Sequence, residues 1–137
     1  MARTNVSALA ATDAVGDGIG YATLPGQTAV GGTATQTTNR TTGVTVDKLC
    51  GQITTDTTSL AAEATAKFTV TCARVAATDV VNVSIASGSN SGGTIVAVTA
   101  VANGSFVIAV QNNNASGGTA ETGAIVINYA ILKATNA

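Results

Sequence analysis

The sequence contains no histidine and no tryptophan, and only 9% of its 137 residues are charged. Histidine is the commonest general base and a frequent metal ligand. Its absence excludes a serine triad of the usual kind and leaves Cys50 and Cys72 without the partner that would raise their thiolate content. Aromatic residues make up 3% of the chain, which is too few for the stacking platforms of a sugar-cleaving groove.

The few charges nearly cancel. A formal net charge of -1 predicts no broad attraction to nucleic acid or to an anionic membrane. Apolar runs are only a few residues long, so we expect no membrane span. The N-terminal stretch lacks the apolar block of a signal peptide, since Asp13 and Asp17 interrupt it. We therefore expect a protein made in the cytosol, without a nucleic-acid or membrane partner, that leaves by lysis if it leaves at all.

Small side chains dominate the hydrophobic content, which is 45% of the chain. Alanine and valine each bury less area than the large side chains, whose full burial contributes about 1.5–3 kcal/mol. The fifteen glycines add to the entropy lost on folding. Mean hydropathy is +0.36, which argues against disorder of the C-terminal two-thirds. A single copy would therefore gain little free energy from its small buried side chains relative to the entropy it loses on folding. Burial of apolar surface between copies would add to that gain, so we expect a homo-oligomer.

Residues 1–42 show neither a helical nor a strand period, and they hold the only proline, Pro25. Their glycines would interrupt any helix. We predict an extended N-terminal arm that lies on a neighbouring molecule. The stretch GDGIG at 16–20 has the composition of a phosphate-binding loop, but it follows no strand and opens no helix, so we predict no site there.

From Gly43 onward the apolar residues alternate with polar ones, which is the strand period. The spacing indicates six or seven strands and predicts an all-β fold, an antiparallel β-sandwich of the jelly-roll or Ig-like type over residues 43–137. Gly51 indicates a bulge or a close backbone approach. Residues 94–102 have the pattern of a strand covered on both faces. Residues 60–67 are too short for a helix, so we predict a loop or a single turn there. We expect a core of Phe68, Val70, Val81, Val83, Phe106, Ile108, Ile127 and Tyr129.

The remaining candidates for chemistry are five carboxylates and two cysteines. Each carboxylate lies in or beside a predicted turn, where aspartate satisfies backbone N–H groups and glutamate is solvated; they are Asp47, Asp56, Glu63, Asp79 and Glu121. Two cysteines in a cytosolic protein are more typical of buried small side chains than of a disulfide. We predict no catalytic residue, no cofactor-binding residue and no metal ligand. Arg40 and Lys48 flank the first clear strand, where we expect them to be available for pairing across a subunit seam.

Three stretches resemble a family of small structural proteins of tailed bacteriophages: GVTVDKLCGQIT, VAATDVV and INYAILKA. The resemblance covers roughly residues 40–134. It implies a virion component, either a capsid decoration (cement) protein or the body of a head or tail fibre, usually trimeric and β-rich. The family often has asparagine after FTVT, where this chain has Cys72, so the resemblance implies no shared disulfide. It also offers no catalytic residues to transfer.

Because the resembling module makes up nearly the entire chain, we expect a capsid decoration protein. A trimer would bind the outer surface of the head, bridge neighbouring major capsid proteins and stabilise the expanded shell, after assembly in the host cytoplasm. The alternative is a head- or tail-fibre module that binds the host surface or a carbohydrate. That alternative requires exposed aromatics and carboxylates around a groove, and Tyr21 and Tyr129 are the only tyrosines.

Overall fold

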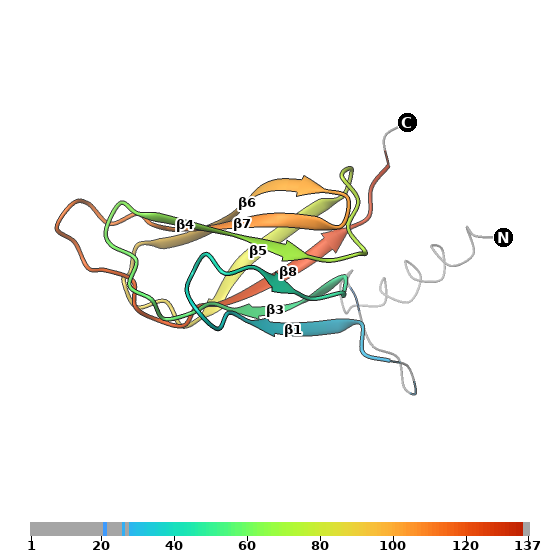
Figure 1. Ribbon diagram of the computed structural model, residues 1–137, viewed down its shortest axis with the longest axis horizontal. Coiled ribbons are helices and arrows are strands. Elements are labelled where there is room, and N and C mark those ends of the chain that lie inside the picture. Colours follow the sequence, from blue (N-terminus) through green and yellow to red (C-terminus); the bar gives the residue numbers. More distant parts are fainter. Residues whose placement is uncertain (1–20, 22–25, 27, 136–137) are drawn as a thin grey trace, which may run out of the picture.

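The computed structural model describes residue 21, residue 26 and residues 28–135, and all regular secondary structure in this part of the chain is β-strand. The strands are β1 (Gly31–Thr35), β2 (Val44–Thr45), β3 (Cys50–Thr54), β4 (Thr65–Thr71), β5 (Val80–Ser87), β6 (Thr94–Ala102), β7 (Ser105–Asn112) and β8 (Val126–Leu132). They form sheet A, in the order β1-β3-β8-β5, and sheet B, in the order β2-β4-β7-β6. The two sheets stack as layers (Figure 1), which confirms the predicted all-β sandwich.

Two of the strand pairings are parallel, although the pattern predicted an antiparallel sandwich. β1 runs parallel to β3, and β2 runs parallel to β4, while the four other pairings are antiparallel. The chain leaves sheet A after β1 and enters sheet B as β2, so these two short strands do not form a hairpin with each other. Side chains alternate with period two in both parallel and antiparallel sheets, so the sequence pattern could not distinguish a parallel pairing from an antiparallel one.

The boundary predicted at residue 42 is wrong, because β1 lies within the range expected to be arm. Gly32 of β1 pairs with Gly51 of β3. Gly51 has φ +152, and a Cβ there would lie 1.9 Å from the carbonyl oxygen of Gly32. The close backbone approach predicted at Gly51 is therefore confirmed. Its partner is Gly32, one of the glycines from which we predicted an arm without regular secondary structure. Residues 1–20, 22–25 and 27 of the predicted arm lie outside the described residues.

The core lies between the sheets and contains the predicted residues. Seven of the eight are buried, and Val83 is partly buried against the same cluster. Phe106 of sheet B and Tyr129 of sheet A meet there with ring centroids 5.9 Å apart. The largest completely buried aliphatic side chains are isoleucines from β3, β7, β8 and the residue that precedes β8; they are Ile53, Ile108, Ile125, Ile127 and Ile131.

Two local predictions have different outcomes. Residues 60–67 contain an isolated bridge, a turn and the start of β4, so the prediction of a loop or single turn is confirmed. β6 is not covered on both faces in the single chain: it lies at the edge of sheet B, and Ile95 is 50% exposed. Its outward positions carry small or branched residues, which made the strand look buried in sequence.

Candidate interaction surface

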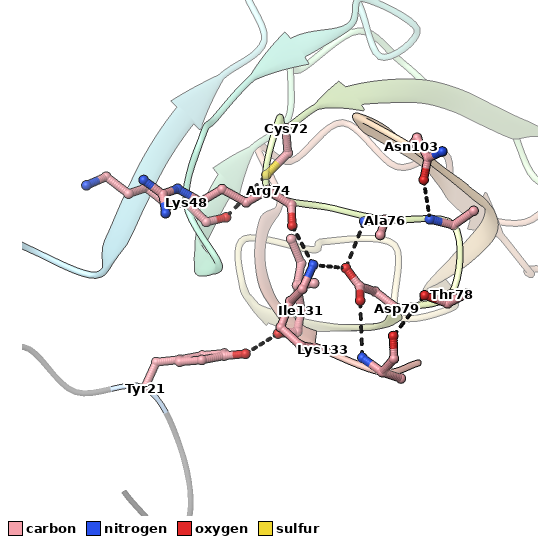
Figure 2. Close-up of polar contacts among 12 residues, drawn as sticks. Tyr21, Lys48, Cys72, Arg74, Ala76, Thr78, Asp79, Asn103, Ile131 and Lys133 are labelled. Carbon is pink, nitrogen blue, oxygen red and sulfur yellow. Dashed lines mark hydrogen bonds and ion pairs between the residues drawn. The ribbon is translucent and has the colours of Figure 1, made fainter. Parts of the chain in front are cut away.

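Parts of the three stretches that resemble the phage family, residues 46–49, 75–79 and 133–134, lie at one end of the sandwich, which we call the terminus end. It consists of residues 46–49, 72–79, 103–104 and 133–135, and β1 begins there. In Figure 1 the blue segment before β1 and the red segment after β8 both lie at this end. Figure 2 shows the polar contacts that join these loops. The remaining residues of the three stretches continue into β2, β3, β5 and β8.

Asp79 is the centre of the terminus end. Its side chain lies 2.5 Å from the ammonium nitrogen of Lys133, and it accepts hydrogen bonds from the backbone N–H groups of Ala76 and Ala134 at 2.8 and 3.2 Å. Lys133 Nζ also donates to the Arg74 carbonyl at 2.8 Å (Figure 2). The hydrogen bond from Lys133 lowers the pKa of Asp79 below its usual range, against the opposing effect of burial. Asp79 satisfies backbone N–H groups, as predicted, and it is buried, at 6% exposure.

The turn before β3 is held by side chains from the core. Tyr129 donates its hydroxyl to the Lys48 carbonyl at 3.1 Å, and the Cys72 thiol lies 3.5 Å from the same oxygen. Burial raises the pKa of Tyr129 well above its usual value, so the hydroxyl remains a donor. Cys50 and Cys72 are both free thiols, and Cys72 is buried, as expected of a small apolar side chain.

Glu121 is the centre of the opposite end, which we call the Glu121 end. This end consists of residues 36–43, 55–64, 88–93 and 112–125. The carboxylate accepts the hydroxyls of Ser89 and Thr94, both at 2.6 Å, and the N–H groups of Gly123 and Asn90 at 2.8 and 3.1 Å. Burial alone would raise the pKa of Glu121, but these hydrogen bonds outweigh it and lower the pKa to about 2. The prediction that Glu121 is solvated is wrong, because its exposed fraction is 0%.

Arg40 joins the neighbouring loops at the same end. Its guanidinium donates to Thr55 Oγ1 at 3.0 Å and to the carbonyls of Thr58, Glu121 and Gly123 at 2.5, 3.3 and 2.8 Å. Arg40 is only 3% exposed. It therefore lies inside the subunit, and the expectation that it pairs across a subunit seam is wrong.

The geometry of these buried groups fits a structural role. Every contact of the Glu121 carboxylate comes from a hydrogen-bond donor, and a metal ion would require oxygen or nitrogen acceptors beside it. No group of three or more His, Cys, Asp or Glu residues that could hold a metal occurs within residues 21, 26 and 28–135. Glu63 is exposed, and Asp56 accepts the N–H of Thr58 at 2.7 Å in a turn, as predicted. Asp47 is exposed and lies 4.0 Å from Arg74.

Charge is almost absent from the strands. Lys67 of β4 is the only charged residue in any of them. On the outer face of sheet A, exposed Val80 and Leu132 pair across β5 and β8. On the outer face of sheet B, β6 exposes Ile95, Ala97, Ala100 and Ala102. Flat faces of this kind can contact another protein without the cost of desolvating ions.

Aromatic side chains are not available on these faces. Phe68, Phe106 and Tyr129 are buried, which leaves partly exposed Tyr21 as the fourth and last aromatic of the chain. A shallow depression of about 180 Å³ on sheet A is lined by Asn82, Ser84 and Asn128, among others. Its polar groups are amides and hydroxyls. Tyr129 also lines it, but this residue is only 3% exposed and its ring packs against Phe106 in the core, so the depression lacks the stacking surface of a typical sugar site.

No helix in the described residues is long and apolar enough to cross a membrane. No family model matches the chain, and no curated protein or solved structure matches it either.

Proposed function

We propose that the protein is a bacteriophage capsid decoration protein that binds the outer surface of the head as a trimer. It would bridge neighbouring major capsid proteins and stabilise the expanded shell. The observation that carries this proposal is the pair of outer sheet faces, which hold one charged residue between them. Such faces suit permanent contact with other proteins, since burying them leaves few ions without partners.

The phage resemblance supports the same proposal from the sequence. Parts of its three stretches lie at the terminus end, where Lys133, Asp79 and Ala134 join the last strand to the loop before β5. A region joined in this way keeps its shape when it is pressed against a neighbour. The fibre-module alternative is favoured less, because three of the four aromatic side chains are in the core rather than around a groove.

The proposal is tested by mixing the purified protein with expanded capsids that lack it and imaging the particles. We expect regular added density at capsomer junctions or symmetry axes, and a sedimentation mass of three copies for the free protein. Density confined to the tail, or no density on heads at saturating protein, would overturn the proposal.

Two face variants show which surface makes the contacts. Ser84→Glu places a charge on the outer face of sheet A, and Ala97→Glu does so on sheet B; both positions are exposed and neither belongs to the core. A carboxylate buried at a protein contact lowers affinity by roughly tenfold or more. Asn113→Glu, at an exposed position of the Glu121 end, is the matched control and should bind heads normally. Normal trimers and normal head binding for both face variants would contradict the assignment of these faces.

A further inference from the structure

The turn between β6 and β7 consists of an asparagine and a glycine. Ala102 pairs with Ser105, so Asn103 and Gly104 alone connect the two strands. Gly104 has φ +82, and no heavy atom lies within 4 Å of the place that a Cβ would take. Asn103 is exposed, and the sequence contains no second asparagine followed by glycine. This turn is therefore the one place in the chain where an asparagine amide precedes a backbone nitrogen that no side chain shields.

An asparagine in this setting can lose its amide nitrogen without an enzyme, because the reacting groups are neighbours in one chain. The Gly104 backbone nitrogen gives up its proton to solvent and attacks Cγ of Asn103. The bond from the backbone nitrogen to Cγ forms, the bond from Cγ to Nδ2 breaks, and Nδ2 takes up a proton and leaves as ammonia. Water then opens the resulting five-membered imide at either carbonyl carbon, which leaves aspartate or isoaspartate at position 103. Water is the only co-reactant, and nothing is oxidised or reduced.

The loop between β4 and β5, residues 72–79, holds both reacting groups. The Gly104 N–H donates to the Val75 carbonyl at 2.9 Å, and the Ala77 N–H donates to Oδ1 of Asn103 at 2.9 Å (Figure 2). The Gly104 carbonyl accepts the Cys72 N–H at 2.9 Å. The proton on the Gly104 nitrogen and the carboxamide of Asn103 are thus both engaged by the loop. The nitrogen can attack only after the loop has moved away from the turn.

Asp79 restrains the opening of this loop. Its carboxylate accepts the Ala76 N–H at 2.8 Å, and Ala76 lies between the two residues that contact the turn. Lys133 ties the loop to the end of β8, since its ammonium contacts both Asp79 and the Arg74 carbonyl. Weakening these contacts should therefore increase the fraction of molecules in which the turn is released.

We infer that Asn103 is a site of non-enzymatic deamidation in the folded protein, and that opening of loop 72–79 sets its rate. The observed rate is the rate of a free Asn–Gly pair multiplied by the fraction of molecules with the loop open. Deamidation adds a negative charge to the terminus end, and isoaspartate also adds a backbone carbon to a turn of two residues. The inference does not depend on the proposed function.

Ageing of the purified protein in mildly alkaline buffer made with oxygen-18 water tests the inference. Peptide mass spectrometry then measures the conversion of each asparagine, since each new carboxyl group carries one heavy oxygen. We expect the fastest conversion at position 103, and a rate in urea at least about tenfold above that of the folded protein. Faster conversion at another asparagine of the folded protein, no conversion at position 103, or equal rates with and without urea would overturn the inference.

Variants of the loop contacts test its role as the gate. Asp79→Ala should raise the rate at Asn103 by about threefold or more in protein that circular dichroism shows to be folded. Lys133→Met leaves the Asp79 carboxylate in place and should raise the rate by less, so it serves if Asp79→Ala does not fold. Asp56→Ala is the matched control, because Asp56 accepts a backbone N–H in a turn at the opposite end. A rate in folded Lys133→Met and Asp79→Ala equal to that of the control would overturn the role of the loop.

Discussion

The two ends of the sandwich each contain a buried carboxylate, but they hold it in different ways. At the terminus end, Asp79 is held by the ammonium of Lys133, a side chain that is half exposed. At the Glu121 end, the carboxylate is held by neutral donors, two hydroxyls and several backbone N–H groups. The first arrangement combines one half-exposed side chain with the two backbone N–H groups of Ala76 and Ala134, and the second depends on the shape of two loops. Removal of the carboxylate should therefore lower the stability of the protein more at the Glu121 end than at the terminus end.

The largest expected effect is that of Glu121→Ala. The substitution leaves the hydroxyls of Ser89 and Thr94 and the N–H groups of Asn90 and Gly123 without their acceptor. We expect a loss of about 3–5 kcal/mol in the free energy of unfolding, since each buried unsatisfied group costs about 1–3 kcal/mol. Urea denaturation measures this loss. Glu63→Ala, at an exposed position, is the control and should stay within about 0.5 kcal/mol.

The second effect is a loss of stability on acidification. The pKa of Glu121 is lowered from 4.5 to about 2, so the unfolded state binds the proton more tightly than the folded state. This contribution is complete above pH 4.5 and is lost as the pH falls toward 2, by about 3 kcal/mol in total. Denaturation curves between pH 6 and pH 2 measure it. Glu121→Gln should flatten this part of the profile, and an unchanged slope would contradict the role of Glu121.

The smallest effect should come from the terminus end. Asp79→Asn keeps one acceptor oxygen, although the N–H groups of Ala76 and Ala134 bond to different carboxylate oxygens, and it removes the charge attraction to Lys133. We expect a smaller fall in melting temperature than that caused by Glu121→Ala. Lys133→Met should cause a smaller fall still, because it removes the ammonium but leaves both Asp79 oxygens for the backbone N–H groups. The double variant should be no worse than the single ones together. A fall in Asp79→Asn that exceeds that of Glu121→Ala would reverse the comparison of the two ends.

Sequence reasoning succeeded where one period governs a whole strand. In β4 and β8 the buried and exposed residues alternate without interruption, so their core side chains were predicted correctly. It failed for β1. The glycines of this strand allow close packing on β3, but in the sequence they led us to predict an arm without regular secondary structure. Strand order and direction depend on contacts between distant residues, which a local pattern does not record.

Glu121 and Arg40 were missed because both lie in loops made of turn residues. A signal for each is nevertheless present in the sequence. Glu121 is the only charged residue between Asp79 and Lys133, and Arg40 is the only one between Asp17 and Asp47. In a chain with so little charge, a single ion within a long neutral stretch indicates a buried structural contact, because solubility alone would not favour one isolated position.

The parallel pairing of β1 with β3 has a mechanical consequence. The chain enters β1 at the terminus end, so tension applied to the preceding residues along the strand axis slides β1 past β3. Five residue pairs, from Gly31–Cys50 to Thr35–Thr54, then bear the load at the same time. A hairpin pulled apart from its open end would instead lose its pairs one by one. A pulling force on the residues before β1 therefore acts in shear on the β1–β3 pairing, and we expect this geometry to require a larger unfolding force than the unzipping of a hairpin.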